Sequence, residues 1–422
     1  MKARGNVERR MYPCCVYVCL MLPCLGKYMA LGSDLHLNVA RGTQELSRIQ
    51  SGLRRINKPA VKSIQSPDGD IIDCVLKLNQ PALDHPKLKN KHIQESPSLR
   101  PTRTNPSEKH TRTHKFIQSW SQNGHCPIDT IPIRRSKESE IRHMNGSLKI
   151  YGQKSSGGVK PHSPAVPGPP TLNRHEHAIS YLESGPYYGA KATINLWKPG
   201  VQMPNEFSLS QIWVLGGSFE DDLNSVEAGW QVSPEIYGDT NPRFFTYWTS
   251  DAYRSTGCYN LLCSGFVQTS NEIVIGGSIS PVSSSNGLQY DITILIWKDP
   301  NTGHWWLEYG DYIVGYWPSY LFTHLALYAT TLEWGGEVVN SEPDGRHTTT
   351  RMGSGVFAES GYGRASYFKN LGFVDSSNAL RSPSDLQTFA TYPDCYDILG
   401  ASNSDWGAFF YYGGPGLNPL CR

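Results

Sequence analysis

The sequence lacks the patterns that usually mark a nucleophilic or metal-dependent hydrolase. Residues 173–422 contain no Gly-x-Ser-x-Gly elbow and only five histidines, and no Cys-x-x-Cys pair occurs anywhere in the 422 residues. A serine nucleophile needs a partner base, and a zinc site needs closely spaced Cys or His ligands. We therefore expect no metal and no cofactor, and these absences argue against serine, cysteine and metal-dependent hydrolysis.

Long apolar runs are also missing. A membrane-spanning helix needs about 20 consecutive apolar residues, and no stretch after residue 30 provides them. The first 30 residues place four basic side chains before a short apolar stretch at 11–26. That order is typical of a signal peptide, so we expect a leader over 1–30, a secreted protein that can reach the cell wall or vacuole, and no membrane partner.

The first part of the chain has little tryptophan and little negative charge. Residues 1–172 hold one of the eleven tryptophans and carry 27 Lys+Arg against 12 Asp+Glu. Residues 173–422 carry 12 against 25, so the two parts have net charges of +15 and −13. A basic segment alone suggests nucleic acid, but opposite charges within one chain favour the two parts as each other's partners. We expect no nucleic-acid partner.

Cysteine is scarce after the leader. Six cysteines remain there, an even number that is consistent with disulfides formed outside the cytosol. The sequence alone leaves several pairings open, but the division of the chain favours Cys74–Cys126, Cys258–Cys263 and Cys395–Cys421.

The distribution of turn residues and apolar residues divides the chain. Residues 155–174 are rich in Gly, Ser and Pro and have linker composition. Upstream, the apolar spacing within 31–60 predicts an amphipathic helix. From residue 175 on, short β-branched and aromatic runs separated by turns predict an antiparallel β-sandwich or barrel, and a helix is expected only over 319–329.

Two acidic residues occupy matching settings within the predicted strands. Glu227 precedes Ala-Gly-Trp, and Glu337 follows Trp-Gly-Gly. Because side chains alternate between the faces of a strand, each acid shares a face with a glycine and points away from the nearby tryptophan. A single glutamate on a strand is usually solvated. Two in matching settings instead suggest an open groove in which an extended ligand can approach the backbone.

The segments around these acids resemble a known family. Residues 225–268, 289–322 and 332–340 are similar to the plant neprosin family of secreted glutamic peptidases. Residues 60–90 and 124–135 are similar to that family's activation domain. The resemblance implies a mainly β protein, in which a small mixed activation domain precedes an antiparallel β-sandwich catalytic domain.

The resemblance also implies a division of the chain and a mode of activation. It predicts an activation domain over 31–136, a linker over 137–174 and a catalytic domain over 175–422. It predicts a zymogen whose own activation domain is the partner in cis, and a monomer. The family's type member cleaves after proline in acid, which implies substrates rich in proline.

The family's two catalytic glutamates fall on Glu227 and Glu337. Two carboxylates that share one proton can activate water and protonate the leaving nitrogen. We expect Glu227 to be the base and Glu337 the acid, with the reverse assignment open.

Further residues are candidates for binding and modification. Aromatic side chains that could stack on a substrate proline, or that could simply belong to the core, are Tyr237, Tyr247, Trp305 and Trp306. Asn145 begins an Asn-Gly-Ser sequon and is a candidate for glycosylation in a secreted protein. Two other functions stay open, because glycosidases also use paired carboxylates and a β-sandwich can bind carbohydrate or cell wall without catalysis.

Overall fold

The computed structural model describes residues 46–89, 91–103, 118–138, 140, 175–219 and 221–422. The predicted leader, most of the predicted linker and Asn145 lie outside these residues. The described residues belong to two units that are divided after Gly52, and every strand among them belongs to the second. The helix predicted within 31–60 is present over 46–56. Among the described residues, no helix is long and apolar enough to cross a membrane.

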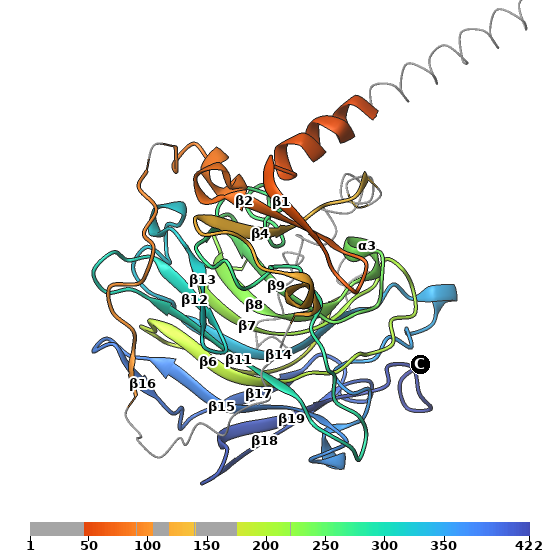
Figure 1. Cartoon of the computed structure of the whole chain (residues 1–422). Coiled ribbons are helices and arrows are strands. Elements are labelled where there is room, and N and C mark those ends of the chain that lie inside the picture. The colour runs from red at the N-terminus through yellow and green to blue at the C-terminus, as the bar shows by residue number, and fades with distance from the viewer. Residues whose placement is uncertain (1–45, 90, 104–117, 139, 141–174, 220) are drawn as a thin grey trace, which may run out of the picture. The chain divides into compact units, whose positions relative to one another are not determined.

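A small antiparallel sheet forms the first part of the larger unit. Its order is β1 (Ala60–Gln65), β2 (Ile71–Leu76) and β4 (Thr130–Arg134). Trp120 and the disulfide Cys74–Cys126 are buried beside this sheet, in a cluster that includes Val274 of the later part of the chain. The three strands lie together at the top of Figure 1.

Two larger sheets follow and pack as a sandwich (Figure 1). The six-stranded sheet has the order β17-β5-β14-β7-β8-β9. Its strands are β5 (His175–Leu182), β7 (Ser208–Gly216), β8 (Asn224–Val232), β9 (Arg243–Thr249), β14 (Thr331–Val339) and β17 (Gln387–Ala390). All its neighbouring strands are antiparallel.

The ten-stranded sheet follows the path β10-β13-β12-β11-β6-β15-β16-β3, with β19 on β15 and β18 on β19. Its strands are β3 (Thr102–Arg103), β6 (Gly189–Asn195), β10 (Val267–Gln268), β11 (Asp291–Lys298), β12 (Trp305–Tyr309), β13 (Tyr312–Trp317), β15 (Ser366–Val374), β16 (Ala379–Arg381), β18 (Asp397–Asn403) and β19 (Gly407–Gly413). Short helices connect the strands: α3 (Pro234–Tyr237), η1 (Lys77–Asn79), η2 (Pro81–Asp84), η3 (Ser119–Asn123), η4 (Ser319–Leu321), η5 (Pro343–Gly345) and η6 (Ala358–Ser360).

The core between the two sheets follows the predicted alternation. Val226, Ala228 and Trp230 of β8 and Trp334 of β14 point into it and are fully buried. Nearly all residues of this cluster come from 175–422, the exceptions being Val75, Ile131 and Ile133. The sandwich therefore holds an almost complete core of its own. The prediction of a mainly β fold with an antiparallel sandwich is confirmed.

The prediction of a helix over 319–329 is wrong. The segment forms only the single turn η4 and then irregular turns. The side-chain oxygen of Asn224 accepts hydrogen bonds from the backbone N–H groups of Thr323, His324 and Leu325, at 2.9, 2.8 and 3.3 Å. A side chain from a distant strand thus satisfies donors that a helix would have bonded internally.

The disulfides are paired as predicted. Cys258–Cys263 and Cys395–Cys421 lie in the second part of the chain and Cys74–Cys126 in the first. Since no disulfide of the described residues joins the two parts, cleavage between them would leave each part with its own cross-links.

The glycines beside the two acids are required by the close approach of the neighbouring strands. A Cβ on Gly229 would lie 2.0 Å from the carbonyl oxygen of Ser210 on β7. A Cβ on Gly335 would lie 2.3 Å from the carbonyl oxygen of Ala178 on β5. The space that a side chain would need is filled by the backbone of the neighbouring strand, so these glycines permit close strand pairing.

We predict that Gly229→Ala destabilises the protein, because the added methyl group collides with backbone that cannot move alone. The free energy of unfolding in urea should fall by about 2 kcal/mol or more, as for other overpacked sites. Gly200→Ala is the control, because the nearest atom to its Cβ is 4.0 Å away. Equal stability of the two variants would contradict this account of Gly229.

Candidate active site

Glu227 and Glu337 project from the same face of the six-stranded sheet. They lie on β8 and β14, and β7 runs between these strands. Glu227 pairs with Trp213 of β7, and Glu337 pairs with Leu209 of the same strand. Trp213 and Leu209 belong to an aromatic cluster on the outer face of this sheet, away from the inter-sheet core. The two acids thus lie on opposite sides of β7, and their partners on that strand are four positions apart.

Gln211 lies midway between the acids. It pairs with Gly229 on one side and with Gly335 on the other, so neither of its direct cross-strand partners carries a side chain. Its Nε2 donates a 2.8 Å hydrogen bond to Glu227 Oε2. Its Oε1 is buried and has no hydrogen-bond partner among the described residues. An acceptor is therefore available between the two carboxylates.

Glu227 is 2% exposed and sits among donors. Besides Gln211, the hydroxyl of Ser225 donates to it at 2.7 Å and that of Tyr253 at 2.6 Å. Burial, and then the negative charge of Glu227, raise the pKa of Tyr253 well above its usual value. Tyr253 thus stays protonated and remains a donor. Three donors therefore surround this one carboxylate.

Glu337 is fully buried and faces two histidines of β5. His175 Nδ1 lies 2.5 Å from Glu337 Oε1, and His177 Nε2 lies 3.7 Å from Oε2. His177 is its direct cross-strand neighbour. Unlike Glu227, Glu337 therefore has nitrogen groups beside it that can exchange a proton with it.

The four aromatic candidates divide into two pairs. Tyr247 pairs with Glu227 across β8 and β9, and Tyr237 of α3 belongs to the same outer-face cluster. Trp305 and Trp306 do not join them. Trp305 lies in the inter-sheet core, and Trp306 lies on the outer face of the ten-stranded sheet. The two tryptophans are adjacent in β12, so their side chains point to opposite faces of the ten-stranded sheet. The two acids lie on the six-stranded sheet, so neither tryptophan belongs to this site.

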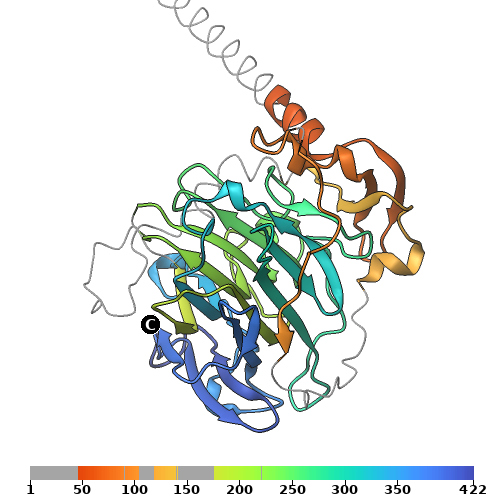
Figure 2. The ribbon, with the colours of Figure 1, turned by 90° about the vertical axis from the view of Figure 1, so that its left-hand side faces the viewer.

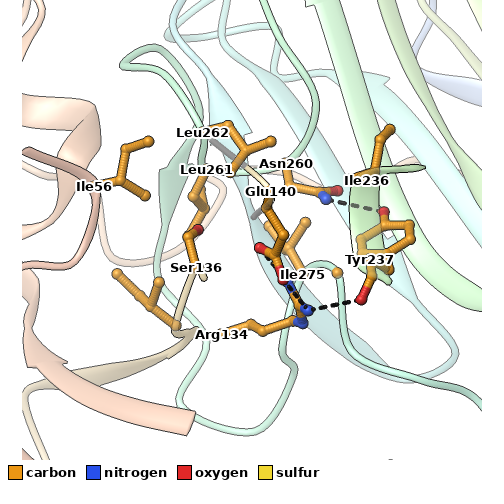
Figure 3. A pocket seen from close by; sticks show the side chains of 12 residues that line it. Ile56, Arg134, Ser136, Glu140, Ile236, Tyr237, Asn260, Leu261, Leu262 and Ile275 are labelled. Carbon is orange, nitrogen blue, oxygen red and sulfur yellow. Dashed lines mark hydrogen bonds and ion pairs between the residues drawn. The ribbon is translucent and has the colours of Figure 1, made fainter. Parts of the chain in front are cut away.

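The early part of the chain docks beside this face through buried charges. Asp70 accepts from Arg134 at 3.0 Å and from Arg243 of β9 at 2.6 Å. Arg134 also pairs with Glu140, and both arginines lie over the ring of Tyr237. Figure 3 shows Arg134, Glu140 and Tyr237 lining a small cavity at this contact. Tyr237 in turn accepts a hydrogen bond from Gln231 of β8, which connects the contact to the acid-bearing face.

Acid weakens this contact. Burial alone raises the pKa of Asp68 and Asp239, but the hydrogen bonds from Ser278 to Asp68 and from Arg243 to Asp239 outweigh it, so both pKa values lie below the usual 3.8. For a lowered carboxyl pKa, the stabilisation is present above the usual value and is lost as the pH falls through the folded value. The stabilisation from the contact between Asp68 and Ser278, which joins the early and later parts, therefore fades below about pH 4. Asp239 and Arg243 both belong to the later part, so their pair stabilises that part itself.

His175, His177, Gln211 and Tyr253 were not predicted as site residues. His175 and His177 lie 160 and more positions before their partner in sequence, and Gln211 is an ordinary strand residue. The spacing His-x-His in 175–177 was a signal, because alternate strand positions share a face. Nothing in the local pattern identified Gln211 or Tyr253.

One further group of the described residues has the spacing of metal ligands. His347, Cys395 and Cys421 have ligand atoms within 4.8 Å of one another. The two cysteines form a disulfide, so they offer no thiolate and the group is not suited to a metal. His347 instead contacts Glu176 of β5, with Nε2 2.9 Å from Oε2.

We predict that His347→Gln destabilises the protein in acid more than at alkaline pH. Burial lowers the pKa of His347, but the hydrogen bond and the charge of Glu176 raise it by more, so the pKa lies above the usual 6.5. The pair therefore stabilises fully below the usual pKa and less as the pH rises through the folded value. The loss of unfolding free energy should be about 1.5–3 kcal/mol at pH 5. His324→Gln, at an exposed pair with Asp222, should cost under about 1 kcal/mol. A loss at His347 that does not change with pH would contradict the assignment.

Comparison with known proteins completes the description of the site. Residues 204–415 match the family model described as Neprosin, and residues 63–181 match the model described as Neprosin activation peptide. The second match extends over β5, a strand of the six-stranded sheet.

Several solved structures show a remote likeness. Scytalido-glutamic peptidase with a peptide-based transition state analog is 11% identical, with 57% of this chain and 98% of that chain covered and a TM-score of 0.31. SCP-B, a member of the Eqolisin family of peptidases in complex with the tripeptide Ala-Ile-His, is 12% identical, with 57% and 96% covered and a TM-score of 0.31. A β-porphyranase of the human gut bacterium Bacteroides plebeius is 8% identical, with 37% and 53% covered and a TM-score of 0.21.

Proposed function

The chain belongs to the neprosin family, and we propose that it is a secreted glutamic endopeptidase made as a zymogen, active in acid and directed to proline. The observation that carries this proposal is the placement of Glu227 and Glu337 on one face of one sheet, on either side of Gln211. A family match alone would not require this arrangement.

The chemistry that we propose uses the two acids in turn. Glu227 takes a proton from a water molecule, which attacks the peptide carbonyl carbon. Glu337 gives a proton to the leaving nitrogen as the C–N bond breaks. The three hydrogen-bond donors around Glu227 hold its carboxyl oxygens as acceptors, and this supports its role as the base. His175 supports the role of Glu337 as the acid, because its ring lies within hydrogen-bonding distance and can hold or return the proton.

The early part of the chain is the partner in cis. We propose that cleavage before β5 releases it, because β5 pairs with β14 over eight residues and carries His175 and His177. The activation-peptide match runs to residue 181, but loss of β5 would remove a central strand of the sheet. The mature enzyme in this proposal therefore begins upstream of His175.

We predict that Glu227→Gln and Glu337→Gln each lower the cleavage of a proline-containing fluorogenic peptide in acid. Loss of one proton transfer should lower kcat by about 10²- to 10⁴-fold. The matched control is Glu333→Gln, which is on the same face of β14, four residues before Glu337. It should change kcat by less than about threefold, since nothing assigns it a proton transfer.

The variants and the parent protein should all be processed by the same added protease before assay, so that failed self-activation is not mistaken for lost catalysis. Equal turnover by the parent and both glutamine variants would disprove the dyad. If the parent cleaves no peptide at all, the protein is better described as a binding protein.

We predict that Asp70→Asn releases the early part of the chain at higher pH than in the parent. Asn keeps the size of Asp but leaves the buried Arg134 and Arg243 without their shared counter-charge, and breaking such a pair costs about 3–5 kcal/mol. The measurement is the rate of chain shortening against pH, with N-terminal sequencing of the product. Asp84→Asn is the control, because it removes a surface pair with Lys58 in the same region. A product that retains Cys74, or identical pH profiles, would contradict the proposal.

A further inference from the structure

A segment of the early part of the chain covers part of the outer face of the ten-stranded sheet, and we name the covered surface the groove. Residues 93–103 of this chain occupy it in extended form and end in β3, which pairs with β16. Figure 2 shows this segment in orange, running down over the ten-stranded sheet. The groove is separate from the acids, which lie on the outer face of the other sheet.

Three aromatic rings form the floor of this groove. Trp297, Trp306 and Tyr316 are paired in register across β11, β12 and β13. The ring centroids are 6.5 Å apart for the two tryptophans and 4.7 Å apart for Trp306 and Tyr316. Ile93 packs against this cluster. Trp306, a sequence candidate for contact with a peptide, therefore does meet a peptide segment, but in this groove.

Side chains of the sheet bind the backbone of the segment. Trp297 Nε1 donates to the carbonyl oxygen of Leu99 at 3.0 Å. The Gln94 N–H donates to the hydroxyl of Tyr316 at 3.1 Å, and the Ser98 N–H donates to Asp299 Oδ2 at 2.6 Å. Main-chain groups are common to all peptides, so these bonds suit any extended chain.

Two buried carboxylates add selectivity. Asp299 also accepts from the hydroxyl of Ser98, and Glu308 forms an ion pair with Arg100. Asp299 is fully buried and Glu308 is 5% exposed. A carboxylate that loses such a partner must be rehydrated or paired again. Removal of the segment therefore leaves two acids and three aromatic rings prepared for another peptide of the same kind.

We propose that this groove is an exosite of the mature enzyme for an extended segment of a protein substrate. The preferred segment carries a small hydroxyl residue and an arginine two positions later, as Ser98 and Arg100 do here. Pro97 and Pro101 flank these positions, and aromatic floors suit the preformed extended conformation of proline-containing chains. The inference rests on the proposed function, since the groove becomes free only when the early part of the chain is removed.

Such an exosite raises efficiency on long substrates. A protein that is held at the groove presents its other segments to the acids at a high effective concentration. A short peptide that cannot reach both sites gains nothing. The enzyme would therefore prefer long chains with a basic, proline-containing stretch away from the cleaved bond.

The first experiment measures binding without relying on catalysis. A specific protease site is placed within 155–174 of the full chain, the chain is cut, and the early part is separated in acid. The probe is a fluorescein-labelled peptide with the sequence of residues 93–103, IQESPSLRPTR. Saturable binding is expected, weakened about tenfold by Asp299→Asn or Glu308→Gln, as for a lost charge-assisted hydrogen bond.

Matched controls make this binding specific. Asp311→Asn alters an exposed carboxylate in the turn between β12 and β13 and should leave the dissociation constant unchanged. A probe with Arg100→Ala should bind about tenfold more weakly to the parent, but no more weakly to Glu308→Gln. No saturable binding, or equal binding by all variants, overturns the exosite.

The second experiment separates a substrate exosite from a site that serves only the chain's own segment. A short fluorogenic peptide is compared with the same peptide joined to IQESPSLRPTR by a flexible linker. The extended form should have about tenfold higher kcat/KM with the parent and Asp311→Asn, and this advantage should vanish with Glu308→Gln. No advantage with the parent overturns the substrate role. If neither peptide is cleaved, the peptidase proposal fails, while the binding result still decides whether the groove binds peptide.

Discussion

The pairing of β7 with β8 on one side and β14 on the other is the constraint on which the site depends. Both pairings are antiparallel and without interruption, and Gly229 allows the backbones of β7 and β8 to approach closely. Since side chains alternate along each strand, fixing these two registers fixes which residues share a face. The acids and Gln211 share the outer face for this reason alone.

That same face explains why the two acids differ although the sequence gives them similar neighbours. Glu227 lies among an amide and two hydroxyl groups, and all three donate hydrogen bonds to its carboxyl oxygens. Glu337 lies beside imidazole rings, which can also accept a proton. Two chemically identical side chains thus have different surroundings, and strands β5 and β7 carry most of the groups that make the difference.

The contacts of the early part of the chain do not follow from net charge. The opposite charges of the two parts suggested a general attraction, but the ion pairs between them run in both directions. Asp70 reaches Arg243 of the later part, whereas Arg100 reaches Glu308. These contacts are specific and short in range, so salt should screen them less than a diffuse attraction between charged surfaces. The sandwich keeps an almost complete core without them.

Local patterns in the sequence were enough for the strands and for the face on which each acid lies, because alternation and turn signals are properties of neighbouring residues. The disulfide pairing was favoured by the division of the chain and was confirmed by the structure. They failed for residues 319–329, where Asn224 on a distant strand takes the backbone donors, and for Trp305 and Trp306, which belong to the other sheet. Strand order and register join residues far apart in the chain, and no local pattern encodes them. Only the tertiary structure could therefore place Gln211 between the acids, His175 beside Glu337, and residues 93–103 on an aromatic floor.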